Sequence, residues 1–163
     1  MPRAGHYDRP VDNALELGHV TDRRPPFKYA AFARVWFSDT DAQGVVYYGR
    51  YLPYFDHART EYHRHLGGLA GLDDAEFVMR ASHVDYLAPA RFDDLIEAFV
   101  RVSRIGRTSV TYDFSAWRRP DDTLLVQSTQ TLVLVDSAER RPTPIPEELR
   151  APLRAFEGAD LEE

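Results

Sequence analysis

Residues 37–51 read FSDTDAQGVVYYGRY and separate two segments of different periodicity. Residues 29–37, which precede the turn, are rich in alanine, valine and aromatic side chains, a composition typical of a strand. The apolar residues that follow recur with the spacing of one helix face: Tyr51, Tyr54, Phe55, Ala58, Tyr62 and Leu66. Because Pro53 fits only the first turn of a helix, we expect the helix to begin near Arg50, and Gly67-Gly68 ends it.

The rest of the chain alternates apolar and polar residues and predicts four further strands, at residues 78–88, 95–105, 109–117 and 124–135. A short helix is expected at residues 147–156. Strands joined as hairpins make an antiparallel sheet, and the long helix must cover its apolar face. The sequence therefore predicts an α+β hotdog fold, in which a five-stranded antiparallel sheet wraps around one long central helix.

The chain consists of two regions that differ in composition. Residues 1–27 are polar and rich in proline, so we expect a loosely ordered N-terminal extension before a single domain at residues 28–163. One helix cannot cover the whole sheet and leaves an edge strand unpaired. We therefore expect a homo-oligomer, either a dimer or a homotetramer.

The overall composition narrows the classes of function. A net charge of −6 disfavours binding to nucleic acid, and no apolar run approaches the ~20 residues of a membrane span. With no cysteine, the chain can have neither a disulfide nor a thiolate metal site nor a cysteine nucleophile. The N-terminus lacks a signal-peptide pattern, so a cytoplasmic location is expected.

Asp39 and Asp41 lie where the first strand ends, before a glycine turn and a helix start. Unpaired N–H groups at a helix start can polarise a carbonyl, and a nearby carboxylate can act as nucleophile or as general base for water. This pattern is compatible with acyl transfer. Taken alone, it also fits an aspartate that merely caps a helix or stabilises a turn.

The run DTDAQGVVYYGRY, followed by LPYFDHARTEY, resembles the signature of the 4-hydroxybenzoyl-CoA thioesterase family, which includes the acyl-CoA thioesterases encoded beside the Tol-Pal envelope system. The resemblance implies hydrolysis of an acyl-CoA to free acid and CoA, without a cofactor or a metal. It also implies that Asp41 is the catalytic carboxylate and that the backbone N–H of Tyr48 polarises the thioester carbonyl. Many members that act on simple aliphatic substrates have histidine where this chain has Tyr48.

The residues around this pair are expected to bind the substrate: Gly44, Val45, Val46 and Tyr51. The resemblance leaves open whether the acyl group is aryl, short or long, and which arginines hold CoA. Two other functions stay open, a non-catalytic acyl-CoA-binding hotdog protein and a thioesterase acting on an acyl-carrier protein. A dehydratase or hydratase would show a histidine-containing motif that this sequence lacks.

Other polar groups of the sequence are alternative candidates for a functional site. His63 and His65 are two residues apart on a helix and point to different sides, so they cannot share one metal ion. Alternation along a strand likewise separates Ser82 from His83 and disfavours a catalytic triad there. Glu61 follows the apolar helix face loosely and is a weaker candidate for the pocket, although related hotdog thioesterases use a helix glutamate.

Overall fold

The computed structural model describes residues 16–68 and 74–163. Its strands are β1 (Gly18–Arg24), β2 (Phe27–Arg34), β3 (Ala75–Tyr86), β4 (Leu95–Ile105), β5 (Ser109–Arg119) and β6 (Thr123–Asp136). Its helices are α1 (Tyr51–His65) and α2 (Glu147–Glu157), with short 3-10 turns η2 (Phe37–Asp39), η3 (Tyr48–Arg50) and η4 (Gly158–Asp160). None of the described helices is both long enough and apolar enough to cross a membrane.

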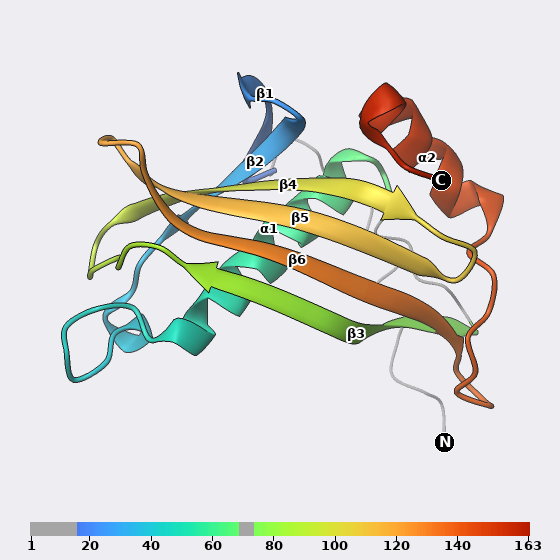
Figure 1. The fold of residues 1–163 in the computed structure, drawn as a ribbon, viewed down its shortest axis with the longest axis horizontal. Coiled ribbons are helices and arrows are strands. Elements are labelled where there is room, and N and C mark those ends of the chain that lie inside the picture. Colours follow the sequence, from blue (N-terminus) through green and yellow to red (C-terminus); the bar gives the residue numbers. More distant parts are fainter. Residues whose placement is uncertain (1–15, 69–73) are drawn as a thin grey trace.

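The strands form one antiparallel sheet in the order β1-β2-β4-β5-β6-β3. The long helix α1 crosses one face of this sheet, and α2 lies beside the sheet near the C-terminus (Figure 1). This arrangement is the hotdog architecture that the order of elements predicts. The turn between β2 and α1 that contains Asp41, called the Asp41 turn below, lies at one end of α1. The C-terminal end of α1 approaches α2.

The sheet has six strands in the described part of the chain, one more than predicted. The additional strand is β1, which falls inside the region predicted as a loosely ordered extension. It pairs with β2 through Gly18 opposite Ala31 and Val20 opposite Tyr29, and the Leu17 N–H donates to Glu61 Oε2 at 2.8 Å. The strand escapes sequence reasoning because it lies at the sheet edge, where polar residues face solvent and the alternation is weak. Residues 1–15 of the predicted extension lie outside the described residues.

The helix prediction is confirmed by the burial of its apolar face. Tyr51, Tyr54, Phe55, Ala58 and Tyr62 are all buried against the sheet. The rings of Phe55 and Phe114 on β5 lie 4.9 Å apart between centroids. This packing fixes the start of α1, and with it the turn that precedes the helix.

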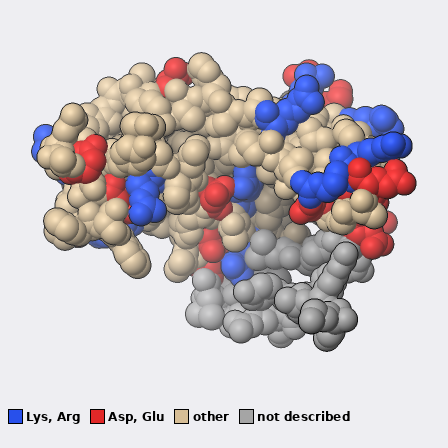
Figure 2. Space-filling view, turned by 90° about the horizontal axis from the view of Figure 1, so that it is seen from below, with Lys and Arg blue, Asp and Glu red and all other residues tan. Residues whose placement is uncertain are grey.

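The predicted strands agree with the structure to within a few residues. Strand β4 has the predicted bounds, β3 begins and ends earlier than predicted, and α2 is one residue longer. Figure 2 shows one face of the molecule, on which uncharged residues cover much of the surface and charged side chains of both signs gather toward one end. Several large apolar residues are exposed near the Asp41 turn: Trp36, Phe37, Tyr47, Tyr48, Tyr86, Leu87 and Phe92.

Candidate active site

The turn between β2 and α1 is closed by its own backbone. The Asp41 N–H donates to Val45 O at 2.9 Å, and the Gly44 N–H donates to Asp41 O at 2.9 Å. Thr40 and Val46 form an antiparallel bridge across the turn. Gly44 has a φ of +74°, a conformation that glycine adopts without the penalty that a Cβ would add. The turn is thus a compact unit, with Asp41 close to its tip.

The carboxylate of Asp41 is held on one side and free on the other. Its Oδ1 accepts a hydrogen bond from the Gln43 N–H at 2.8 Å. Among the described residues, no donor or cation contacts its second oxygen. The side chain is half-buried, so water or a substrate can reach it. A partly oriented carboxylate with a free oxygen can take a proton from water or attack a carbonyl.

Asp39 plays a different part from Asp41, since both of its carboxylate oxygens face protein groups. Its Oδ2 accepts hydrogen bonds from the Trp36 N–H at 2.9 Å and from the Tyr54 O–H at 2.7 Å, while Arg50 Nε lies 3.8 Å from its Oδ1. Burial, and then the hydrogen bond to Asp39, raise the pKa of the Tyr54 hydroxyl. Asp39 therefore ties the turn to the first turn of α1.

The backbone at the helix start presents an unpaired donor. The Tyr47 N–H donates to Asp39 O at 2.9 Å, and the Arg50 N–H donates to Tyr47 O at 2.8 Å. Within the part of the chain that the structure describes, the Tyr48 N–H has no acceptor. It lies at the first residue of η3, which runs directly into α1, so it belongs to the positive end of the helix dipole. The Thr40–Val46 bridge places Asp41 and Tyr48 at the same end of the molecule.

The four residues predicted to bind substrate differ in their surroundings. Gly44 is exposed and Val45 is half-buried, whereas Val46 and Tyr51 are buried in the core. The Val46 N–H donates to Ala90 O at 2.8 Å, and the Tyr51 hydroxyl accepts from the Ala90 N–H at 3.1 Å. Val46 and Tyr51 thus anchor the turn to the loop before β4. Their role in substrate binding stays a prediction.

Tyr86 is a neighbour of the site that the sequence did not indicate. Its hydroxyl donates to Tyr48 O at 3.0 Å, and its ring lies 6.3 Å from the Tyr48 ring between centroids. It comes from the end of β3, about forty residues further along the chain. No local pattern connects the two positions, because the contact depends on the sheet topology.

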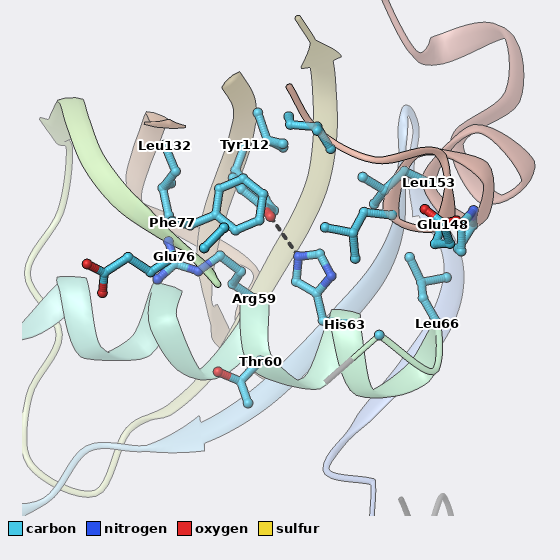
Figure 3. A pocket seen from close by; sticks show the side chains of 16 residues that line it. Arg59, Thr60, His63, Leu66, Glu76, Phe77, Tyr112, Leu132, Glu148 and Leu153 are labelled. Atoms are coloured by element: carbon cyan, nitrogen blue, oxygen red, sulfur yellow. Dashed lines mark hydrogen bonds between the residues drawn. The ribbon is translucent and has the colours of Figure 1, made fainter. Parts of the chain in front are cut away.

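The alternative polar candidates lie elsewhere. His63 Nε2 lies 2.6 Å from the Tyr112 hydroxyl (Figure 3) and His65 lies beside Glu16, so these two side chains point apart, as predicted. Glu61 is buried, where it accepts the Leu17 N–H and pairs with Arg64. His83 contacts Asp85 on the exposed edge strand β3. In residues 16–68 and 74–163, no cluster of three or more histidine or carboxylate side chains is placed to hold a metal ion.

The fold and the turn define the class of protein. Residues 35–153 match the model of the thioesterase-like superfamily, and the chain belongs to this family. It is therefore a thioester hydrolase of the hotdog fold.

Particular relatives agree with this membership. The chain is 34% identical over 122 residues to the acyl-CoA thioesterase YbgC of Haemophilus influenzae, covering 72% of this chain and 88% of the relative. It is also 34% identical over 121 residues to the acyl-CoA thioester hydrolase YbgC of an Escherichia coli O6:H1 strain, covering 72% and 90%. The crystal structure of a thioesterase superfamily protein from Jannaschia sp. CCS1 superposes with a TM-score of 0.74 at 26% identity, covering 83% and 86%.

Proposed function

We propose that the chain hydrolyses an acyl-CoA thioester to the free acid and CoA, with Asp41 as nucleophile or general base. The backbone N–H of Tyr48 polarises the thioester carbonyl in this proposal. Its main support is that one continuous segment, residues 41–48, carries both a carboxylate with a free oxygen and an unpaired N–H at a helix start. The acyl-CoA thioesterases at 34% identity support the class of substrate.

The reaction needs an oxygen nucleophile, a binding site for negative charge and a leaving group. As the nucleophile adds to the carbonyl carbon, negative charge collects on the carbonyl oxygen, where the Tyr48 N–H stabilises it. The C–S bond then breaks, and the CoA sulfur leaves with the bonding electrons and takes up a proton. If Asp41 acts as a base, it removes a proton from water; if it attacks directly, water hydrolyses the resulting anhydride.

Free-thiol release from a panel of acyl-CoAs tests the assignment of Asp41. The Asp41→Asn variant should lose roughly 10²–10⁴-fold in rate, the usual contribution of a general base. Asparagine keeps the acceptor for the Gln43 N–H, so the melting temperature should stay close to that of the wild type. With no cysteine in the chain, the protein adds no background to a thiol-reactive dye.

A matched control is Asp22→Asn, the same substitution at an exposed position on β1. It should keep full activity. Full activity in Asp41→Asn would contradict the catalytic role of this carboxylate. Stabilisation of the wild type by acyl-CoA without any release of thiol would point to a binding protein instead of an enzyme.

Homo-oligomer formation and a cytoplasmic location belong to the same proposal. Strand β3 is the last strand of the sheet and runs over twelve residues, Ala75–Tyr86, with Met79 and Tyr86 about half exposed. Its outer edge offers backbone donors and acceptors to a second copy of the chain. Light scattering coupled to size-exclusion chromatography measures the mass directly, and a monomer of 18.7 kDa would contradict the expected dimer or tetramer.

A further inference from the structure

The last residue of strand β3, Tyr86, connects the outer strand of the sheet to the start of α1. Its hydroxyl donates to Tyr48 O at 3.0 Å, across 38 positions of the sequence. Among the described strands β3 pairs only with β6, and Tyr86 lies opposite Val126 in that pairing. Figure 1 shows the end of β3 and the start of α1 at the same end of the molecule. Tyr86 thus brings a long-range contact to the segment that carries the Tyr48 N–H.

This segment, the short turn η3, has little packing of its own to hold it in place. None of its three residues is buried, so burial of an apolar side chain does not anchor its backbone. Gly49, at its centre, has no side chain and therefore allows more backbone conformations than other residues do. The position of η3 therefore depends on hydrogen bonds and on contacts made by residues outside the turn.

Two hydrogen bonds act on the backbone beside the Tyr48 N–H. The Tyr47 C=O and the Tyr48 N–H belong to one planar peptide group, so the bond from the Arg50 N–H to Tyr47 O at 2.8 Å orients the donor. The position of the Arg50 N–H depends in turn on the two peptide groups between Tyr48 and Arg50. The Tyr86 hydroxyl holds the first of these two groups by its carbonyl oxygen. Tyr86 therefore influences the direction of the Tyr48 N–H through the turn.

The ring of Tyr86 supports the same connection. It packs edge-on against the Tyr48 ring, with 6.3 Å between centroids, and against the Tyr51 ring, with 5.9 Å between centroids. Edge-on packing is a favourable arrangement for two aromatic rings. Tyr48 is exposed, whereas Tyr51 is buried and its hydroxyl accepts a hydrogen bond from the Ala90 N–H. Tyr86 thus joins the exposed Tyr48 to a residue that the core holds in place.

The direction of the Tyr48 N–H matters because a donor must be aimed before the reaction begins. A donor stabilises the negative charge on the carbonyl oxygen most when it already points to the position of that oxygen in the transition state. Misplacing a reacting group by about 1 Å can lower a rate about 10²-fold. A side chain that fixes the donor can therefore raise the rate without contacting the substrate.

We propose that Tyr86 is a positioning residue, whose hydroxyl fixes the Tyr48 N–H through the Tyr48 carbonyl. The inference rests on the proposed function, which gives this N–H its role in hydrolysis. Tyr86 neither attacks the thioester nor transfers a proton. It acts on the transition state, in which the carbonyl oxygen is negative, and so on kcat instead of on substrate binding.

Steady-state thiol release by full-length variants tests the inference. Tyr86→Phe keeps the ring and removes the hydroxyl, and it should lower kcat about five- to tenfold at an unchanged KM, the usual effect of one lost hydrogen bond. Tyr86→Leu also removes the ring contacts and should lower kcat roughly 10²-fold. The matched control is Tyr62→Phe, which loses a hydroxyl bond of 2.7 Å to Glu157 in the core. It should lower the melting temperature without changing kcat.

Amide hydrogen exchange measured by NMR reports the positioning independently of activity. The Arg50 N–H, which is bonded to Tyr47 O, should exchange about fivefold faster in Tyr86→Phe than in the wild type. In Tyr62→Phe the same amide should exchange at the wild-type rate. A lowered kcat without faster exchange at Arg50 would overturn the positioning role of Tyr86.

The kinetic results separate this inference from the proposed function. If Asp41→Asn is inactive while Tyr86→Phe keeps the wild-type kcat, the inference is overturned and the proposed function stands. A raised KM at the wild-type kcat in Tyr86→Phe would also overturn it, because Tyr86 would then contact the substrate. Absence of thiol release by the wild type would refute the proposed function and the inference together.

Discussion

The half-buried imidazole of His63, which hydrogen-bonds with the Tyr112 hydroxyl, makes the stability of the fold depend on pH in a defined interval. In the folded chain its pKa is about 4, lowered first by burial and then by Arg59. In the unfolded chain the pKa returns to its ordinary value of about 6.5. Between these two values the unfolded chain binds a proton that the folded chain does not bind. The free energy of unfolding therefore decreases as the pH falls from 6.5 to 4.

The size of this decrease follows from the gap between the two pKa values. One pKa unit corresponds to about 1.4 kcal/mol, so a gap of about 2.5 units gives ~3 kcal/mol. The contribution is close to zero at pH 7 and reaches this full value near pH 4. Such a loss is a large fraction of the total stability of a domain, which is commonly about 5–15 kcal/mol.

Urea unfolding of the wild type and of His63→Gln at pH 7, 6, 5 and 4 measures the effect. Glutamine does not titrate, and it can still form a hydrogen bond with the Tyr112 hydroxyl. Carboxylates that titrate in both proteins cancel in the difference between the two curves. The wild type should lose ~3 kcal/mol more than the variant over this range. Parallel curves would refute the reasoning, because they would show that His63 takes up its proton equally easily in both states.

Three further substitutions test the turn and the core. Tyr54→Phe removes the hydrogen bond to Asp39 Oδ2 and should lower the free energy of urea unfolding by about 1 kcal/mol and also lower the rate of thiol release. If neither the stability nor the rate changes, this bond does not hold the turn. Gly44→Ala should lower the stability measured by thermal unfolding by about 1 kcal/mol, because the φ of +74° is unfavourable for alanine. No atom lies within 4 Å of the added Cβ, so a much larger loss of stability would contradict the absence of a steric clash. Phe114→Ala should cost about 3–5 kcal/mol by calorimetry, and a cost below 1 kcal/mol would show that the core collapses around the missing ring.

The parts of the fold that were predictable have strong local periodicity. The apolar face of α1, from Tyr51 to Tyr62, repeats over three turns and so indicates both the element and its buried side. Strand β4 carries an apolar side chain at every second residue from Ile96 to Val102, which indicates a strand, although Glu97 and Phe99 on its other face are buried as well. Strand β1 gave no such signal, since its stability comes from pairing with β2 and from the Leu17 contact with Glu61.

The residues of the candidate site likewise differ in whether a local pattern reveals them. Asp41 and Tyr48 are seven residues apart, so one continuous motif contains both and the sequence was sufficient to propose them. Tyr86 and Ala90 reach the turn only through the sheet topology, which no local pattern specifies. The cavity of about 370 Å³ beside His63 (Figure 3) was equally out of reach, because five separate segments of the chain contribute its lining: α1, β3, β5, β6 and the region of α2.

The two edges of the sheet differ in a way that limits how far copies of this chain can associate through strand pairing. Strand β1 is short, its register with β2 shifts between Val20 and Arg24, and Pro25-Pro26 follows it directly. Such an edge is a poor template for another strand, whereas β3 is long and open on its outer side. Two copies joined through β3 would expose only β1 edges. Growth by edge pairing would then stop at a closed pair, which protects a protein with a long free strand from forming fibres.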